Sequence, residues 1–179
     1  MASKKVFTVP FRRKREGKTD YKRRLSLLKS KSLRLVIRKS NKHILAQIIN
    51  YGDQGDLVLK TAHSNELKSY GWKVNNSNIP ASYLTGLLLG KKSGQEQVII
   101  DLGLQTPVKG SRIFAVVKGA MDAGLKIKSS EEVMPTEERI TGKHIKDSKV
   151  AELFEKTKNN ILSGKKVSDV KNVRKTRKK

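Results

Sequence analysis

Charge divides the chain into a near-neutral middle and two strongly basic ends, and this division limits which part can form a core. Residues 1–50 contain 16 Lys and Arg against 2 Asp and Glu, and residues 165–179 contain 8 against 1. The stretch 51–164 contains 16 against 13. Because ordering a segment requires apolar burial, and the first thirty residues contain few apolar side chains, we expect them to order mainly on a partner.

The excess of cations also indicates the kind of partner. Lys and Arg number 40 against 16 Asp and Glu, which gives a formal net charge of +24. Such a charge favours a polyanion, with nucleic acid as the first candidate and an anionic membrane surface as the second. No apolar run is long enough to cross a bilayer, so the sequence predicts no membrane partner.

Residue types that hold metals or form disulfides are scarce. The chain has no cysteine, and its three histidines are not paired at metal-ligand spacing. We therefore expect no disulfide, no metal site and no cofactor, which fits a reducing cytoplasm.

Alternating apolar residues predict where the folded body begins. In residues 33–38, Leu and Ile alternate with Arg and Val, the pattern of a strand with one buried face. Further strands are predicted over residues 43–50 and 57–63, with turns at 39–42 and 52–55. These short links predict an antiparallel meander.

The rest of the body is predicted to contain helices and one more strand. Ser64 is a candidate cap for a short helix that ends near Gly71. A longer helix opens at residues 78–80, with Leu84, Leu87 and Leu88 on one side. A buried strand is predicted over residues 97–100, a helix capped by Ser111 follows it, and an amphipathic helix covers residues 147–162.

These elements predict an α/β fold with a mixed sheet. The three-stranded meander is joined by a further strand, and the helices pack on one face of the sheet. We expect a basic arm with a short helix at residues 1–32 and an α/β body at 33–130. A C-terminal helical region with a basic tail is expected at 131–179.

The N-terminal arm contains the most informative residues for function. Four consecutive cations at residues 12–15 precede a basic helix over residues 21–29, for which Asp20 is the predicted cap. Arginine suits bidentate contact with phosphates and guanine edges, and Tyr21 could stack on an unpaired base. Alternatively, the arm is a solvated basic tail or a localisation signal.

Arg34 and Arg38 share the non-core face of the first strand. They are candidates for contact with the same partner, and the alternative is an ordinary solvent-facing pair.

Two apparent enzyme signatures fail on inspection. Residues 86–93 resemble a phosphate-binding loop, but three residues separate the glycines where four are needed, and Lys92 stands where Ser or Thr is needed. Gly86 instead suits close packing. Asp101 and Asp122 are the acids best placed for a metal-dependent nuclease, but such a site needs several convergent carboxylates.

Several segments, in order along the chain, resemble one known family. They are residues 13–21 (RKREGKTDY), 34–43 (RLVIRKSNKH), 83–88 (YLTGLL), 110–114 (GSRIF), 119–125 (GAMDAGL) and 137–145 (EERITGKHI). They resemble the archaeal and eukaryotic form of the L-eighteen family of large-subunit ribosomal proteins, known in eukaryotes as the L-five protein. The chain stops at Lys179 without the long C-terminal extension of the eukaryotic form, so we expect an archaeal source.

This resemblance implies a fold and a function. The fold would be an α/β body similar to ribonuclease-H-like components of the translation machinery, without catalysis. The function would be to bind 5S rRNA with the arm and the adjacent sheet and to help anchor it in the central protuberance of the cytoplasmic large ribosomal subunit. The expected partners are 5S rRNA, 23S rRNA and neighbouring ribosomal proteins of the central protuberance. The implied RNA contacts are Arg12, Arg13, Arg15, Lys18, Thr19, Tyr21, Arg24, Arg34, Arg38, Lys39, Ser40, Asn41 and Lys42.

Three classes of function are therefore compared. The first is a structural binder of ribosomal RNA, and the second is a nucleoid-type protein that binds nucleic acid in general. The third is an RNA-processing enzyme on a ribonuclease-H-like body. The motifs favour the first class over the second, and the missing carboxylate cluster disfavours the third.

Overall fold

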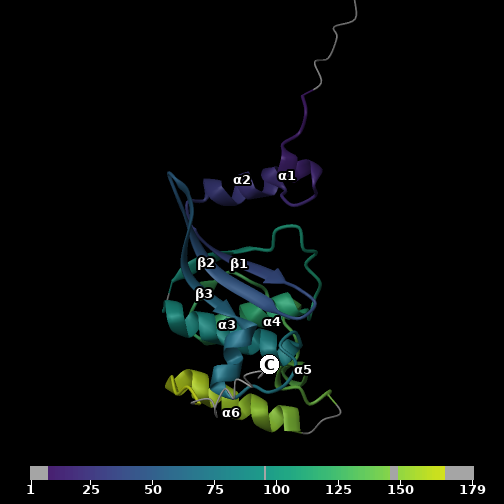
Figure 1. Cartoon of the computed structure of the whole chain (residues 1–179), viewed down its shortest axis with the longest axis vertical. Helices are drawn as coiled ribbons and strands as arrows, with labels where there is room; N and C mark the ends of the chain where they lie inside the picture. The colour runs from purple at the N-terminus through teal and green to yellow at the C-terminus, as the bar shows by residue number, and fades with distance from the viewer. Residues whose placement is uncertain (1–7, 95, 146–148, 168–179) are drawn as a thin grey trace, which may run out of the picture.

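The architecture is a mixed sheet with helical layers on both sides. The computed structural model describes residues 8–94, 96–145 and 149–167. Figure 1 shows α1 and α2 on one side of the sheet, α3 and α4 on the other, and α6 beyond them at the far end. We call the side of the sheet beneath α1 and α2 the arm side.

The sheet has five strands in the order β3-β2-β1-β4-β5. Antiparallel pairing joins β1 to β2 and β2 to β3, whereas β4 pairs in parallel with β1 and with β5. The predicted meander and further strand are confirmed, but the sequence missed β5, whose two residues are too few for a periodicity. The strands are Leu33–Lys39, Ile44–Gly52, Gly55–His63, Gln97–Asp101 and Lys126–Ile127.

Both faces of β1 are buried, which corrects the expectation of a single buried face. Leu35 and Ile37 have no exposed area and point into the core, and on the other face Arg34 is 1% exposed and Val36 is 6% exposed. Figure 1 shows α2 above this second face. Alternation of apolar residues could not reveal this burial, because Arg34 is buried by pairing with charged groups.

The helices α3 (Ile79–Ser93) and α4 (Arg112–Asp122) cross at very close range beneath the sheet. A Cβ atom on Gly86 would lie 2.0 Å from the backbone oxygen of Val116, and one on Gly119 would lie 2.1 Å from that of Tyr83. This confirms the packing role predicted for Gly86. Together with the sheet and the C-terminal helices, α4 buries α3 on all sides over residues 79–90, rather than on the one predicted side.

Two of the predicted helix caps differ in the structure. The short helix is a 3₁₀ helix, η1 (Ser64–Tyr70), and its cap is His63, whose Nδ1 accepts from the Asn65 amide at 3.1 Å. The Ser64 hydroxyl instead accepts from the Ile44 amide on β2. Ser111 occupies the predicted N-cap position of α4 but makes no side-chain capping hydrogen bond.

The C-terminal helices add to the same core. They are η2 (Glu131–Val133), α5 (Glu137–Thr141) and α6 (Lys149–Ser163). Ile140, Phe154 and Ile161 belong to one hydrophobic cluster with the residues of α3 and α4. The predicted amphipathic helix is thus confirmed, while the division of the chain at residue 130 stays a prediction.

Candidate nucleic-acid interface

The arm forms two short helices above the sheet. These are α1 (Arg12–Arg15), which the sequence did not predict, and α2 (Tyr21–Lys29), which has the predicted bounds. The Asp20 carboxylate accepts from the Arg23 amide at 3.1 Å and so caps α2 as predicted. Neither helix has a fully buried residue, although Leu27 and Leu28 of α2 are half-buried, so polar contacts help to fix their position.

Cations around α1 lie on the surface in local contacts. Glu16 pairs with Arg12 Nε at 3.4 Å and with Lys18 Nζ at 2.8 Å. Arg13 donates from Nε to the hydroxyl of Thr19 at 2.9 Å. Exposed ion pairs contribute little to stability, so a phosphate can replace Glu16 at low cost.

Tyr21 is not a free stacking surface in this structure. Its half-buried ring packs against Phe11, with ring centroids 5.1 Å apart and planes tilted by 49°. Phe11 itself is 71% exposed. The two rings therefore form an aromatic pair next to the basic block, and stacking of a base on this pair stays a prediction.

A chain of alternating charges crosses the arm side of the sheet. Asp56 accepts from Arg24 at 2.8 Å through one carboxylate oxygen and from Arg34 at 2.6 Å through the other. Arg34 also donates to the Asp101 carboxylate at 3.2 Å, and Arg38 donates to the backbone oxygen of Asp101 at 2.9 Å. The series of contacts begins at Arg24 on α2, reaches β4 at Asp101 and returns to β1 at Arg38. Its order is Arg24, Asp56, Arg34, Asp101 and Arg38.

The three arginines in this series of ion pairs differ in exposure. The side chains of Arg24 and Arg38 are 38% and 43% exposed, whereas that of Arg34 is 1% exposed. Arg34 is therefore not the solvent-facing residue that strand alternation allowed. Arg34 holds Asp56 and Asp101, which in turn contact the exposed Arg24 and Arg38. A phosphate cannot reach the Arg34 side chain as long as both of its ion pairs hold.

The turn between β1 and β2 presents polar residues at the rim of the sheet. The Ser40 hydroxyl accepts from the His43 amide at 2.9 Å and donates to the His43 carbonyl, so it holds the turn together. Lys39, Asn41 and Lys42 are exposed, as is Arg15 on the arm. These four have no ion pair among the described residues, and they are open to RNA.

A hollow of about 140 Å³ lies between the arm and the segment after β4. Five cations and two carboxylates line it, and Arg23 spans it by donating to the Gly103 carbonyl at 3.3 Å. The sequence missed Gly103 and the part played by Asp101, because only the fold brings β4 beneath the arm. The lining is Arg13, Lys18, Thr19, Asp20, Arg23, Arg24, Leu27, Arg38, Asp101, Gly103 and Leu104.

The two acids weighed for a nuclease site have other partners. Asp101 is held by arginines, and Asp122 accepts from the Tyr83 hydroxyl at 2.7 Å. Burial, together with this hydrogen bond, raises the pKa of Tyr83 well above its usual range. Within the described part of the chain, no group of three or more acids or histidines could hold a metal ion.

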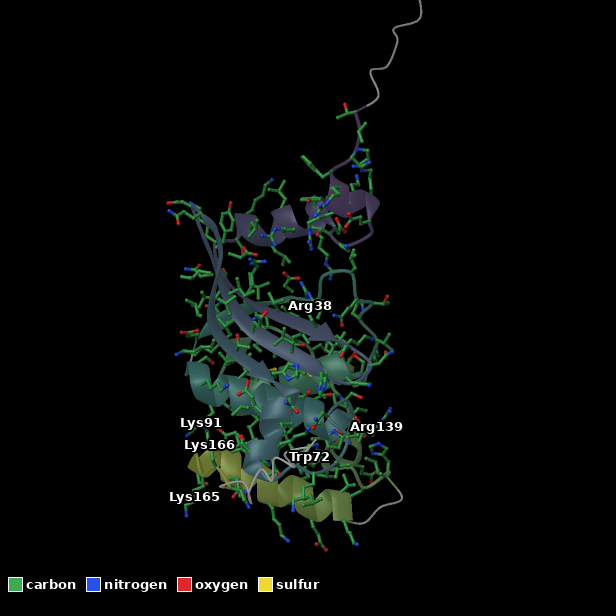
Figure 2. The ribbon with its side chains drawn as sticks, viewed as in Figure 1. Arg38, Trp72, Lys91, Arg139, Lys165 and Lys166 are labelled. Atoms are coloured by element: carbon green, nitrogen blue, oxygen red, sulfur yellow. The ribbon has the colours of Figure 1, made fainter. Side chains whose placement is uncertain are left out.

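The basic tail leaves the body at the end opposite the arm. The Val167 amide donates to the Ser69 carbonyl at 2.8 Å, which fixes the root of the tail on η1. Figure 2 places Lys165 and Lys166 at this end, while Arg38 lies on the arm side. Residues 168–179, which make up most of the predicted tail, lie outside the described residues.

The fold and the interface together define a class of protein, a basic α/β nucleic-acid binder that presents arginines on one side of its sheet. The sequence profile of the family described as "Ribosomal large subunit proteins 60S L5, and 50S L18" matches residues 5–97 and 91–130. The chain belongs to this family of large-subunit ribosomal proteins. The resemblance drawn from the motifs is confirmed up to residue 130, and the segment 137–145 lies outside the match.

Membership of the family establishes the general role. The protein is an RNA-binding constituent of the large ribosomal subunit in the cytoplasm, and it takes part in translation. The family is of a structural, non-enzymatic kind. Within the three described ranges, no helix is long and apolar enough to span a membrane.

Proposed function

We propose that the protein binds 5S rRNA through the arm side of its sheet and helps to anchor this RNA in the central protuberance. The single observation that supports this most is the hollow beneath the arm, where five cations from the arm and β1 converge. Arginine forks at defined positions can read the geometry of a folded RNA, whereas scattered lysines provide attraction alone. Family membership makes ribosomal RNA the polyanion to test first.

The proposed contacts fall into two groups according to their exposure. Direct contacts are assigned to the exposed cations of the arm, to Arg24 and Arg38, and to the turn at residues 39–42. Arg34 is assigned a supporting role because its side chain is buried between two carboxylates. The proposed further partners, 23S rRNA and neighbouring proteins of the central protuberance, would meet the remaining surface.

A structural role without catalysis is part of this proposal. Its support is that Asp101 and Asp122 are engaged with arginines and with Tyr83, respectively. General nucleic-acid binding of the nucleoid type is the second candidate, because net charge alone would permit it.

A competition experiment separates the two candidates. Labelled 5S rRNA bound to the full chain is titrated with unlabelled 5S rRNA, a structured control RNA of equal length and a duplex DNA, all at one salt concentration. We expect 5S rRNA to compete about a thousandfold better than the other two, the lower end of the range known for specific over non-specific binding to DNA. Equal competition by all three would favour the nucleoid-type function.

A further inference from the structure

Two side-chain contacts attach helix α2 to the body. Arg24 pairs with Asp56 on the β2–β3 hairpin at 2.8 Å, and Arg23 donates to the Gly103 carbonyl at 3.3 Å. α2 has no fully buried residue: Leu25 is 56% exposed, whereas Leu27 and Leu28 are half-buried. Because the two half-buried leucines give only limited, non-directional apolar contact, the polar contacts set the orientation of α2.

Asp56 occupies a special place among them. It lies at the start of β3, opposite Tyr51, and its side chain is 27% exposed. One of its oxygens holds Arg24 of the arm, and the other holds the buried Arg34 of the sheet. A single carboxylate thus joins the basic arm to the sheet.

A carboxylate in a surface that binds phosphates requires an explanation, since it repels the ligand. Two explanations make opposite predictions. If Asp56 only neutralises cations in the free protein, its removal should tighten RNA binding. If it fixes the arm in a binding orientation, its removal should weaken RNA binding, because the RNA must then order the arm.

We propose that Asp56 is a positioning residue that docks α2 on the sheet before RNA arrives and so sets the orientation of the arm. This proposal rests on the arm-side binding of RNA proposed above. The geometry favours positioning over neutralisation because Asp56 bridges two arginines from different elements, and one of them is buried. A carboxylate that only neutralised exposed cations would not need the buried partner.

The test compares Asp56→Asn with Asp53→Asn in the full chain. Both substitutions remove one negative charge from the same hairpin, and Asp53 is exposed with no ion pair among the described residues. Amide hydrogen exchange of the free protein is followed in α2 and in β1. We expect Asp56→Asn alone to speed exchange in α2 about twofold to fivefold, the size of effect known for exposed ion pairs.

The affinity for 5S rRNA is measured at one salt concentration for the same variants. We expect Asp56→Asn to weaken binding by a similar twofold to fivefold, and Asp53→Asn to leave it unchanged or slightly tighter. Unchanged exchange in α2, or tighter binding by Asp56→Asn than by Asp53→Asn, would overturn the proposal. So would faster exchange in α2 without any loss of affinity.

A second variant covers the case in which Asp56→Asn also loosens β1 through Arg34. In an Arg24→Gln background, Asp56→Asn should cause no further increase in α2 exchange if the effect passes through Arg24. A further increase of the same size would assign the effect to Arg34 and overturn the proposal. The exchange experiment contains no RNA, so it stands even if the protein shows no preference for 5S rRNA and the proposed function fails.

Discussion

Arg34 and Asp101 lie on neighbouring parallel strands, and their side chains form a buried ion pair with an N–O distance of 3.2 Å. Asp101 also accepts from the Gly103 amide at 2.8 Å, which shapes the segment that lines the hollow. The pair therefore links the stability of the sheet to the shape of the arm side. The Arg34 Nε has no hydrogen-bond partner among the described residues, so the network is not fully satisfied.

Removal of Arg34 should destabilise the whole protein. We expect Arg34→Met to lower the free energy of unfolding by about 2–4 kcal/mol, because it removes a partner from the buried Asp101 and from the partly exposed Asp56. Urea unfolding measures this change. Lys39→Met, which removes a cation from the exposed end of the same strand, should change stability by less than about 0.5 kcal/mol. Equal stability of the two variants would show that the Arg34 network contributes nothing.

The close crossing of α3 and α4 should not accept a larger residue at Gly86. The added methyl group of Gly86→Ala would lie 2.0 Å from the Val116 backbone oxygen. The helices must then separate, which we expect to cost about 3 kcal/mol. Gly52→Ala is the control, since its nearest neighbour would be at an ordinary 3.6 Å. Thermal unfolding compares them, and equal melting temperatures would contradict the close packing.

Binding to 5S rRNA should weaken steeply as salt is added. If the arm side neutralises about six to ten phosphates, the affinity should fall by roughly three to five decades between about 50 and 200 mM salt, by analogy with duplex DNA. Filter binding across a salt series gives the slope. An affinity that does not respond to salt would mean that apolar contacts dominate the interface.

The arm and the tail should contribute differently to recognition. The arm combines arginine forks with Tyr21, whereas residues 165–179 are rich in lysine and contain no aromatic residue. Phosphate contacts of the latter kind add affinity but little specificity. We expect replacement of Arg13, Arg15 and Arg24 by Ala to abolish the preference for 5S rRNA over a structured control RNA.

Deletion of residues 165–179 is the matched experiment. It should weaken the binding of both RNAs by a similar factor and leave their ratio nearly unchanged. Competition titrations at fixed ionic strength compare the two variants. If the deletion removes the preference while the arm substitutions keep it, recognition belongs to the tail.

The sequence by itself determined the elements that depend on local chemistry. Asp20 caps α2 because a carboxylate accepts from amides of the first turn, and the start of α2 follows from that. The meander follows from short apolar runs between turns, and the ribosomal family follows from motifs that are contiguous in the chain. All of these signals lie within a few residues of each other.

Only the tertiary structure decided the burial of Arg34 and the contacts of Asp56. Arg34 is charged, so a pattern of apolar residues assigns it to solvent, yet two carboxylates distant in sequence bury it. Asp56 is 32 residues from Arg24, and only the hairpin brings the two together. The strength of an ion pair depends on the distance between the two charged groups and on their burial, and a local stretch of sequence predicts neither. The sequence therefore located the basic arm, and the fold decided which of its cations are open to RNA.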